Sequence, residues 1–232
     1  MRLSIWAVGI SAIVASSAAF AADLDGGRAA PSAVNWAGFY AGANVGYIGG
    51  RTSATDQGPI PEYVLGHKFS FLANDASVGL QTGYNIQFGA VVFGPEVDVG
   101  TFGVRGSAPY LPTQPDTYII GRANYDVTTR ARVGYAFDRA LLYATGGVIF
   151  TDEHDQLFSF SNVQSPHAAA KAGWVIGGGV EYALTPQWSI KGEYLHYDLG
   201  DMTVTTSNAV NYKVSNAGDM ARIGLNFHFD AR

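Results

Sequence analysis

The chain has 232 residues, no cysteine and a formal net charge of -5, which excludes disulfide frameworks and cysteine-based metal or nucleophile chemistry. Its 14 basic and 19 acidic side chains argue against a nucleic-acid partner. Only 14% of the residues are charged, against about 25% in ordinary soluble domains, so something replaces the charged surface that a soluble domain has.

The N-terminus predicts a secretory signal peptide over residues 1–21. Met1-Arg2 precedes an apolar run from Leu3 to Phe20, and Ala19-Phe20-Ala21 forms a small-x-small cleavage site. Cleavage would remove Arg2 and leave a net charge of -6 (-5 minus 1). An uncleaved membrane helix is the alternative, because the run approaches spanning length. No later run is as long, so a mature chain in a membrane would have to be a barrel.

The mature chain opens with a small, polar segment over residues 22–35, which contains Pro31. We expect it to be a flexible periplasmic lead-in, with a short plug or cap as the alternative. Alternation of apolar and polar side chains begins at Trp36 and predicts a strand as far as Tyr47. A long loop over residues 49–75 should follow, because this stretch is polar and holds two prolines.

A tight hairpin is predicted next, from Ser77 to Phe88 and from Val91 to Thr101 with a turn near Gly89. Its second strand contains Pro95, which a closed barrel has no free edge to tolerate. We therefore predict a bulge at Gly94-Pro95.

The same pattern recurs through the rest of the chain. It predicts strands at Val127–Phe137, Leu141–Phe150, Ala172–Tyr182, Trp188–Tyr197 and Met220–Phe229, and long loops at 103–123, 151–170 and 200–218. The facing of Leu141–Phe150 is left open, because Leu141 and Leu142 are both apolar.

About eight strands of roughly ten residues match the length that crosses a bilayer at a tilt. The connections alternate long and short, as in outer-membrane barrels with long outer loops and short periplasmic turns. A soluble lipocalin-like barrel would share the alternation and the leader, but it predicts neither this rhythm nor the aromatic residues at the strand ends. Those aromatics are Trp36, Phe39, Tyr84, Phe88, Tyr135, Trp188 and Phe229. The prediction is an all-β protein, an eight-stranded antiparallel up-and-down transmembrane β-barrel over residues 36–229.

Several stretches resemble the small outer-membrane β-barrel proteins of alphaproteobacteria, the outer-membrane immunogenic or "porin family" proteins. They are the stretches at 36–47, Tyr143–Gly147, Gly177–Tyr182, Trp188–Tyr194 and Arg222–Phe227. The resemblance implies an OmpA-like barrel that acts as a surface antigen and supports the envelope; a few members are linked to haem binding. Family chains usually stop on an aromatic residue read by the barrel-assembly machinery. Here Phe227 and Phe229 would form that terminal signal, and residues 230–232 extend beyond it.

Four acidic and four basic residues fall on the inward side of the predicted strands. They are Glu96, Asp98, Glu181 and Glu193, and Arg130, Arg132, Lys191 and Arg222. Charges in a narrow lumen are costly unless paired, and eight strands leave an interior just wide enough for side chains. We expect a salt-bridged polar core; a narrow or gated ion path is the alternative.

Enzymatic and metal-binding interpretations have less support. His154 lies among Asp152, Glu153 and Asp155, where a weak cation site is conceivable, but no metal-ligand spacing is met and an exposed acidic loop is the simpler interpretation. We assign no role to His67, His167, His196 or His228 and expect neither a cofactor nor a metal.

The predicted location is the cell outer membrane, and the predicted role is structural and surface-interactive. The expected partners are outer-membrane lipid and lipopolysaccharide, the barrel-assembly machinery, and host or environmental ligands reached through the loops. Passive passage of ions or small solutes, and ligand or haem capture by the loops, are the alternatives.

Overall fold

The computed structural model describes residues 34–56, 68–102, 105–111, 114–159, 162–205 and 211–229. Within these ranges the chain forms nine strands in one antiparallel sheet. They are β1 (Gly38–Asp56), β2 (Lys68–Phe88), β3 (Val91–Thr101), β4 (Arg105–Leu111), β5 (Gln114–Phe137), β6 (Ala140–Ser159), β7 (Asn162–Ala183), β8 (Trp188–Thr205) and β9 (Asn211–His228). No helix in the described residues is long and apolar enough to cross a bilayer. The predicted signal peptide, most of the lead-in and the extension 230–232 lie outside the described residues.

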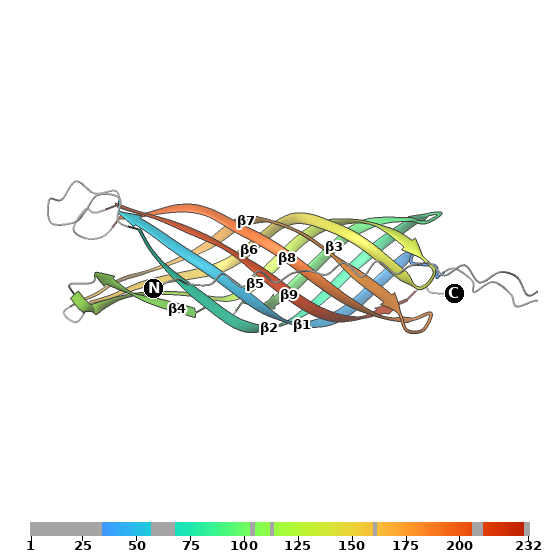
Figure 1. The fold of residues 1–232 in the computed structure, drawn as a ribbon, viewed down its shortest axis with the longest axis horizontal. Coiled ribbons are helices and arrows are strands. Elements are labelled where there is room, and N and C mark those ends of the chain that lie inside the picture. Colours follow the sequence, from blue (N-terminus) through green and yellow to red (C-terminus); the bar gives the residue numbers. More distant parts are fainter. Residues whose placement is uncertain are drawn as a thin grey trace, which may run out of the picture. The chain divides into compact units, whose positions relative to one another are not determined.

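Eight of these strands close into a barrel, and they run obliquely around it (Figure 1). Hydrogen-bonded neighbours follow the order β3-β2-β1-β9-β8-β7-β6-β5, and β3 also pairs with β5, which joins the two ends of the sheet. The first and last strands pair from Tyr40–His228 to Asp56–Tyr212. A closed ring leaves no edge strand, as a bilayer-spanning sheet requires. The predicted eight-stranded antiparallel barrel is confirmed.

The remaining strand, β4, corrects the predicted loop over 103–123. It pairs with β5, starting at Arg105–Arg122, so it continues β3 beyond the end of the barrel. The other predicted loops are also largely strand, because β1 and β2 extend into 49–75, β6 and β7 into 151–170, and β8 and β9 into 200–218. The alternation of apolar and polar side chains stops before the strands do, whereas cross-strand pairing continues through polar sequence. The pattern therefore underestimated the strands.

The three short connections all lie at the opposite end. Two of them are two-residue turns, at 89–90 and 138–139, and the third covers 184–187. Gly89 and Asp138 have φ values of 58° and 52°, in the left-handed region that two-residue hairpin turns use. Aspartate tolerates this region better than most residues do. These turns are the short connections that the sequence predicted.

The predicted bulge at Gly94-Pro95 is wrong. Pairing between β2 and β3 stops after Gly83–Glu96 and resumes at Ile86–Phe93 in the same register. On its other side, β3 pairs with β5 without a break through Pro95–Ala131. Proline has no N–H to donate, and the barrel accommodates it by interrupting one ladder locally, without inserting a residue.

The two faces of the wall follow the predicted alternation. Large apolar side chains such as Leu80, Phe88 and Leu225 are exposed on the outside. The strand whose facing was open is now assigned: Leu141, Tyr143 and Ile149 are buried inward, and their sequence neighbours Leu142, Val148 and Phe150 face out.

Trp36 corrects one member of the predicted aromatic belt. It is only 1% exposed, and its ring makes an edge contact with the His228 ring at 5.7 Å inside the end of the barrel. The residue precedes β1, so strand alternation does not govern its direction. The other six predicted aromatics, Phe39, Tyr84, Phe88, Tyr135, Trp188 and Phe229, are exposed on the outer face. Phe229 packs against Phe39 and Phe227 there.

Candidate functional site

The structure places all eight predicted lumen charges inside the barrel, and all are buried. They are Glu96 and Asp98 on β3, Arg130 and Arg132 on β5, Glu181 on β7, Lys191 and Glu193 on β8, and Arg222 on β9. Strand register sets acid opposite base at Glu96–Arg130, Glu181–Lys191 and Glu193–Arg222. Opposite charges on directly paired inward positions favour each other, so the register itself builds part of the network.

Arg130 is the centre of this network. Its Nη2 donates to Glu96 and, at 2.7 Å, to Asp98 Oδ2, and its Nη1 donates to Glu193 Oε1 at 3.0 Å. Arg222 Nη2 reaches Glu193 and lies 3.3 Å from Asp98 Oδ1. A planar guanidinium can serve several carboxylates at once through its fixed fork of donors. One arginine therefore connects acids from β3 and β8 across the lumen.

Lys191 and Arg132 complete the pairing. Lys191 Nζ lies 3.1 and 3.2 Å from the two carboxylate oxygens of Glu96. Arg132 Nη1 donates to Glu181 Oε2 at 3.0 Å, and its guanidinium carbon lies 4.7 Å from the centre of the Tyr40 ring and 5.2 Å from that of Tyr143. These two aromatic rings add cation–π attraction to the ion pair.

Polar side chains that the sequence pattern pointed inward, but that we did not assign to the network, extend it. Asn44 donates to Gln81 at 2.8 Å, Gln81 donates to Asn226 at 2.5 Å, and Asn226 donates to Glu181 at 2.7 Å. Tyr40 donates its hydroxyl to Glu96 at 2.5 Å. Alternation gave the facing of all four residues, but their partners depend on cross-strand register, which alternation does not provide.

Asp126 is a fifth buried acid that the sequence pattern missed, because the predicted strand began one residue later. It lies on β5 opposite Thr151 and is 3% exposed. Within the described residues, no salt bridge to Asp126 is present. Asp126 therefore adds a fifth buried acid to the four that the sequence pattern predicted.

Two apolar layers lie on either side of the charged layer, in addition to the predicted salt-bridged polar core. The outer layer lies toward the long connections and consists of Ile48, Phe102, Ile149, Val175, Leu195, Tyr197, Leu199 and Met220. The periplasmic layer lies at the short turns and consists of Trp36, Val92, Leu141, Tyr143 and Ala183. Each layer brings together side chains from several strands, β1, β6, β7, β8 and β9 in the outer one and β3, β6 and β7 in the other. The lumen is therefore filled above, within and below the ion pairs.

Ser189 and His228 form the arrangement nearest to a catalytic one. Ser189 Oγ lies 2.9 Å from His228 Nε2 and donates to Glu181 Oε1 at 2.5 Å. The same ring nitrogen faces Glu181 at 3.4 Å, whereas a catalytic triad uses one nitrogen for the serine and the other for the acid. Both residues are buried, and the Trp36 ring lies against that of His228. The arrangement fits a hydrogen-bonded support for Glu181 better than a nucleophile.

Metal binding has no geometric support in the described part of the chain, where no three histidine or acidic side chains gather as ligands. The backbone of residues 152–155 lies within β6, so the prediction of a loop there is wrong. His67 and the side chains of Glu153, His154, Asp155 and His167 lie outside the described residues, so the predicted acidic cluster is not tested.

Comparisons with known proteins agree with this architecture. A family model described as an outer membrane protein beta-barrel domain matches residues 9–229. The 31 kDa outer-membrane immunogenic protein of Brucella melitensis is 32% identical over 236 residues, covering 95% of this chain and 97% of that protein. The 25 kDa outer-membrane immunogenic protein of Brucella abortus is 24% identical over 195 residues, covering 84% and 80%. The crystal structure of the outer membrane protein OprG from Pseudomonas aeruginosa has a TM-score of 0.58 at 14% identity, covering 83% of this chain and 96% of that one, a likeness of fold.

Proposed function

The chain belongs to the outer membrane protein β-barrel family and lies in the cell outer membrane, and on this premise we propose that it is a closed structural barrel that presents surface segments to the exterior. The filled lumen carries this proposal. In the described part of the barrel, buried ion pairs between two apolar layers leave no open path through the lumen. The surfaces that can contact other molecules are therefore the barrel wall and the strand ends that project beyond the lipid.

The surface role rests on the long connections. The strand ends that they join lie where β4 and the extended parts of β5 and β6 stand beyond the barrel (Figure 1). Relatives of this chain are named outer-membrane immunogenic proteins, which supports presentation of these segments at the cell surface. We propose no enzymatic activity, because the relatives' names describe antigens and the Ser189–His228 pair is buried with the wrong geometry.

The test is single-channel conductance of the refolded mature chain in planar bilayers. We expect the wild type to be nearly silent and an Arg130→Ala, Arg132→Ala variant to leak, because removing two cations leaves buried acids that draw in water. Lys213→Ala, which changes an exposed ion pair, is the matched control and should stay silent. Steady channels in the wild type would contradict a closed barrel and favour passive transport of ions or small solutes.

A further inference from the structure

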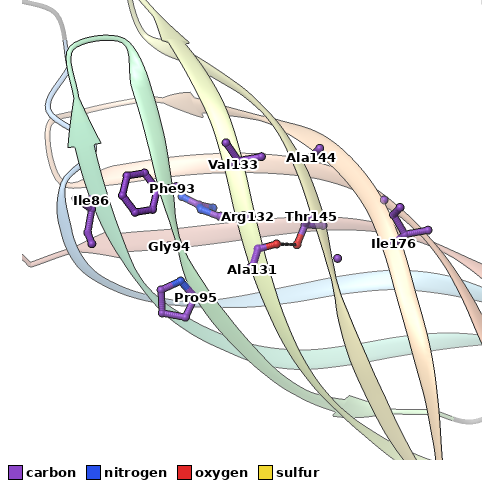
Figure 2. Close-up of a pocket in the computed structure, with 12 residues that line it drawn as sticks. Ile86, Phe93, Gly94, Pro95, Ala131, Arg132, Val133, Ala144, Thr145 and Ile176 are labelled. Carbon is purple, nitrogen blue, oxygen red and sulfur yellow. Dashed lines mark hydrogen bonds between the residues drawn. The ribbon is translucent and has the colours of Figure 1, made fainter.

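The outer wall carries an apolar groove of about 710 Å³ on the lipid-facing side of five neighbouring strands, β2, β3, β5, β6 and β7. Figure 2 shows Ile86 and Phe93 at one end, Ala131 and Ala144 along the middle, and Ile176 at the other end. The large side chains are exposed, and the small ones between them form a lowered floor. The groove therefore belongs to the outside of the barrel, separate from the filled lumen.

The floor of the groove follows one row of cross-strand partners. Pro95 pairs with Ala131, Ala131 with Gly146, and Gly146 with Ile176. Proline, alanine and glycine project little from the wall, so this row is recessed relative to its neighbours. The gap in the β2–β3 ladder also lies at Pro95, at the lower end of the groove.

The same row continues to a polar cluster on the outer face. Ile176 pairs with His196, and His196 pairs with Asp219. His196 Nδ1 lies 2.8 Å from Asp219 Oδ1, and the Tyr194 hydroxyl donates to the same oxygen at 2.6 Å. The Trp174 ring lies 5.6 Å from the His196 ring. One continuous row therefore joins an apolar groove to a hydrogen-bonding cluster beside an indole.

The row climbs through the membrane. Pro95 is four residues from Val91 at the periplasmic end of β3 (95 minus 91), whereas Asp219 is nine residues from His228 at the periplasmic end of β9 (228 minus 219). Nine residues at about 3.3 Å each, tilted by about 40°, rise about 23 Å, close to the height of about 25 Å that the apolar band of such barrels has. The cluster thus lies at the outer edge of the hydrocarbon, and the groove descends from it toward the middle of the bilayer.

From this arrangement we propose that the groove is a binding site for a lipid A-type glycolipid of the outer leaflet. One acyl chain fills the row from Ile176 to Pro95, and the polar backbone of the lipid meets His196 and Asp219. A recess in a lipid-facing wall must be filled by hydrocarbon, since an empty one forfeits its dispersion contacts. A polar cluster at the upper end favours a lipid whose head lies at the outer surface over one from the periplasmic leaflet.

Gly146 provides a sharp test, because a Cβ added there would meet nothing closer than 3.6 Å. Gly146→Leu should therefore fold and fill the floor of the groove. Gly192→Leu is the matched control: Gly192 also faces outward, its added Cβ meets nothing within 4 Å, and it does not line the groove. A heat-modifiability gel shift checks that each variant folds.

The measurement is native mass spectrometry of the mature barrel in detergent, titrated with purified lipid A and, separately, with phosphatidylglycerol. We expect one saturable lipid A on the wild type and on Gly192→Leu, a loss of affinity of about tenfold or more in Gly146→Leu, and a smaller loss in an Asp219→Asn variant. Equal affinity in both leucine variants would overturn the site. Phosphatidylglycerol binding as tightly as lipid A, with the same response to Gly146→Leu, would overturn the assignment to the outer leaflet.

Discussion

The middle of the lumen and the layer just outside it are built from the same strands, yet they hold opposite chemistry. Arg222 and Glu193 belong to the ion network. Two residues away from each, toward the outer end of β9 and β8, the next inward residues are Met220 and Leu195 of the outer apolar layer. The charged layer can be dry because the apolar layers cover it, and dry ion pairs attract one another more strongly than wet ones. The charged layer and the apolar layers therefore stabilise the lumen together, as one stack, and neither kind of layer is sufficient alone.

The strongest way to break this stack is to remove its central cation. Arg130→Ala leaves Glu96, Asp98 and Glu193 buried without their shared partner, and breaking a buried pair on one side costs about 3–5 kcal/mol. We expect a corresponding loss in the free energy of unfolding, measured by urea titration in lipid vesicles, together with loss of the heat-modified gel shift. Arg51→Ala, on the exposed outer face, is the control. Wild-type stability in Arg130→Ala would refute a structural network.

The apolar layer should be the next most sensitive region. Leu195→Ala leaves a cavity beside Met220, which carries a cost of about 2–5 kcal/mol for a buried leucine. Leu225→Ala makes the same chemical change on the outside, where lipid can occupy the vacated space, so its loss should be smaller. Both can be measured by the same urea titration. Equal losses would mean that the outer layer is hydrated and loosely packed.

This pair of leucines also shows how far the sequence could be read. Period-two alternation is a local property, so it correctly directed Arg130, Arg132 and Glu193 inward without any knowledge of their partners. The assumption of a polar lumen hid Leu195, which is buried and apolar. Alternation tells whether a side chain points into the barrel or out of it. It does not give the position along the barrel axis, and the charged and apolar layers differ in that position.

Features outside regular alternation were the least predictable. Trp36 precedes β1, where strand alternation does not apply. Pro95 interrupts the hydrogen bonds between β2 and β3, and whether a strand accommodates a proline depends on both neighbouring strands. The connections between acids and bases depend on register across strands far apart in sequence, such as Arg130 with Glu193. The row from Pro95 to Asp219 has the same origin, because each step joins a different pair of strands.

A smaller effect, and one of opposite sign, should distinguish Asp126 from the acids of the ion network. Asp126→Asn keeps the shape of the side chain and removes a buried charge that no salt bridge in the described residues compensates. We expect stability to rise by about 1 kcal/mol, on the order of one net hydrogen bond. Asp98→Asn, at a carboxylate bound by Arg130 and Arg222, should lower stability under the same conditions. A loss in Asp126→Asn equal to that in Asp98→Asn would show that Asp126 is compensated by a bound cation or water.

The smallest effect is expected at the exposed counterpart of the lumen pairs. Lys213 Nζ lies 2.7 Å from Asp201 Oδ2, on parts of β9 and β8 that extend beyond the lipid, and both side chains are about half exposed. The hydrogen bond from Lys213 lowers the pKa of Asp201 below its ordinary value. A depressed carboxyl pKa contributes stability above the unfolded pKa and loses it as the pH falls through the folded one. For an exposed pair that contribution is screened by water and salt.

Lys213→Ala should therefore move the pKa of Asp201 up toward its ordinary value while the urea midpoint stays unchanged at neutral and at mildly acidic pH. Carboxyl carbon NMR of the barrel in micelles would follow the titration, and Lys213→Arg, which retains the charge, should keep the lowered pKa. A shift in the urea midpoint comparable to that of Arg130→Ala would mean that ion pairs stabilise this barrel wherever they lie. The apolar layers would then not be the reason that the lumen ion pairs stabilise the barrel.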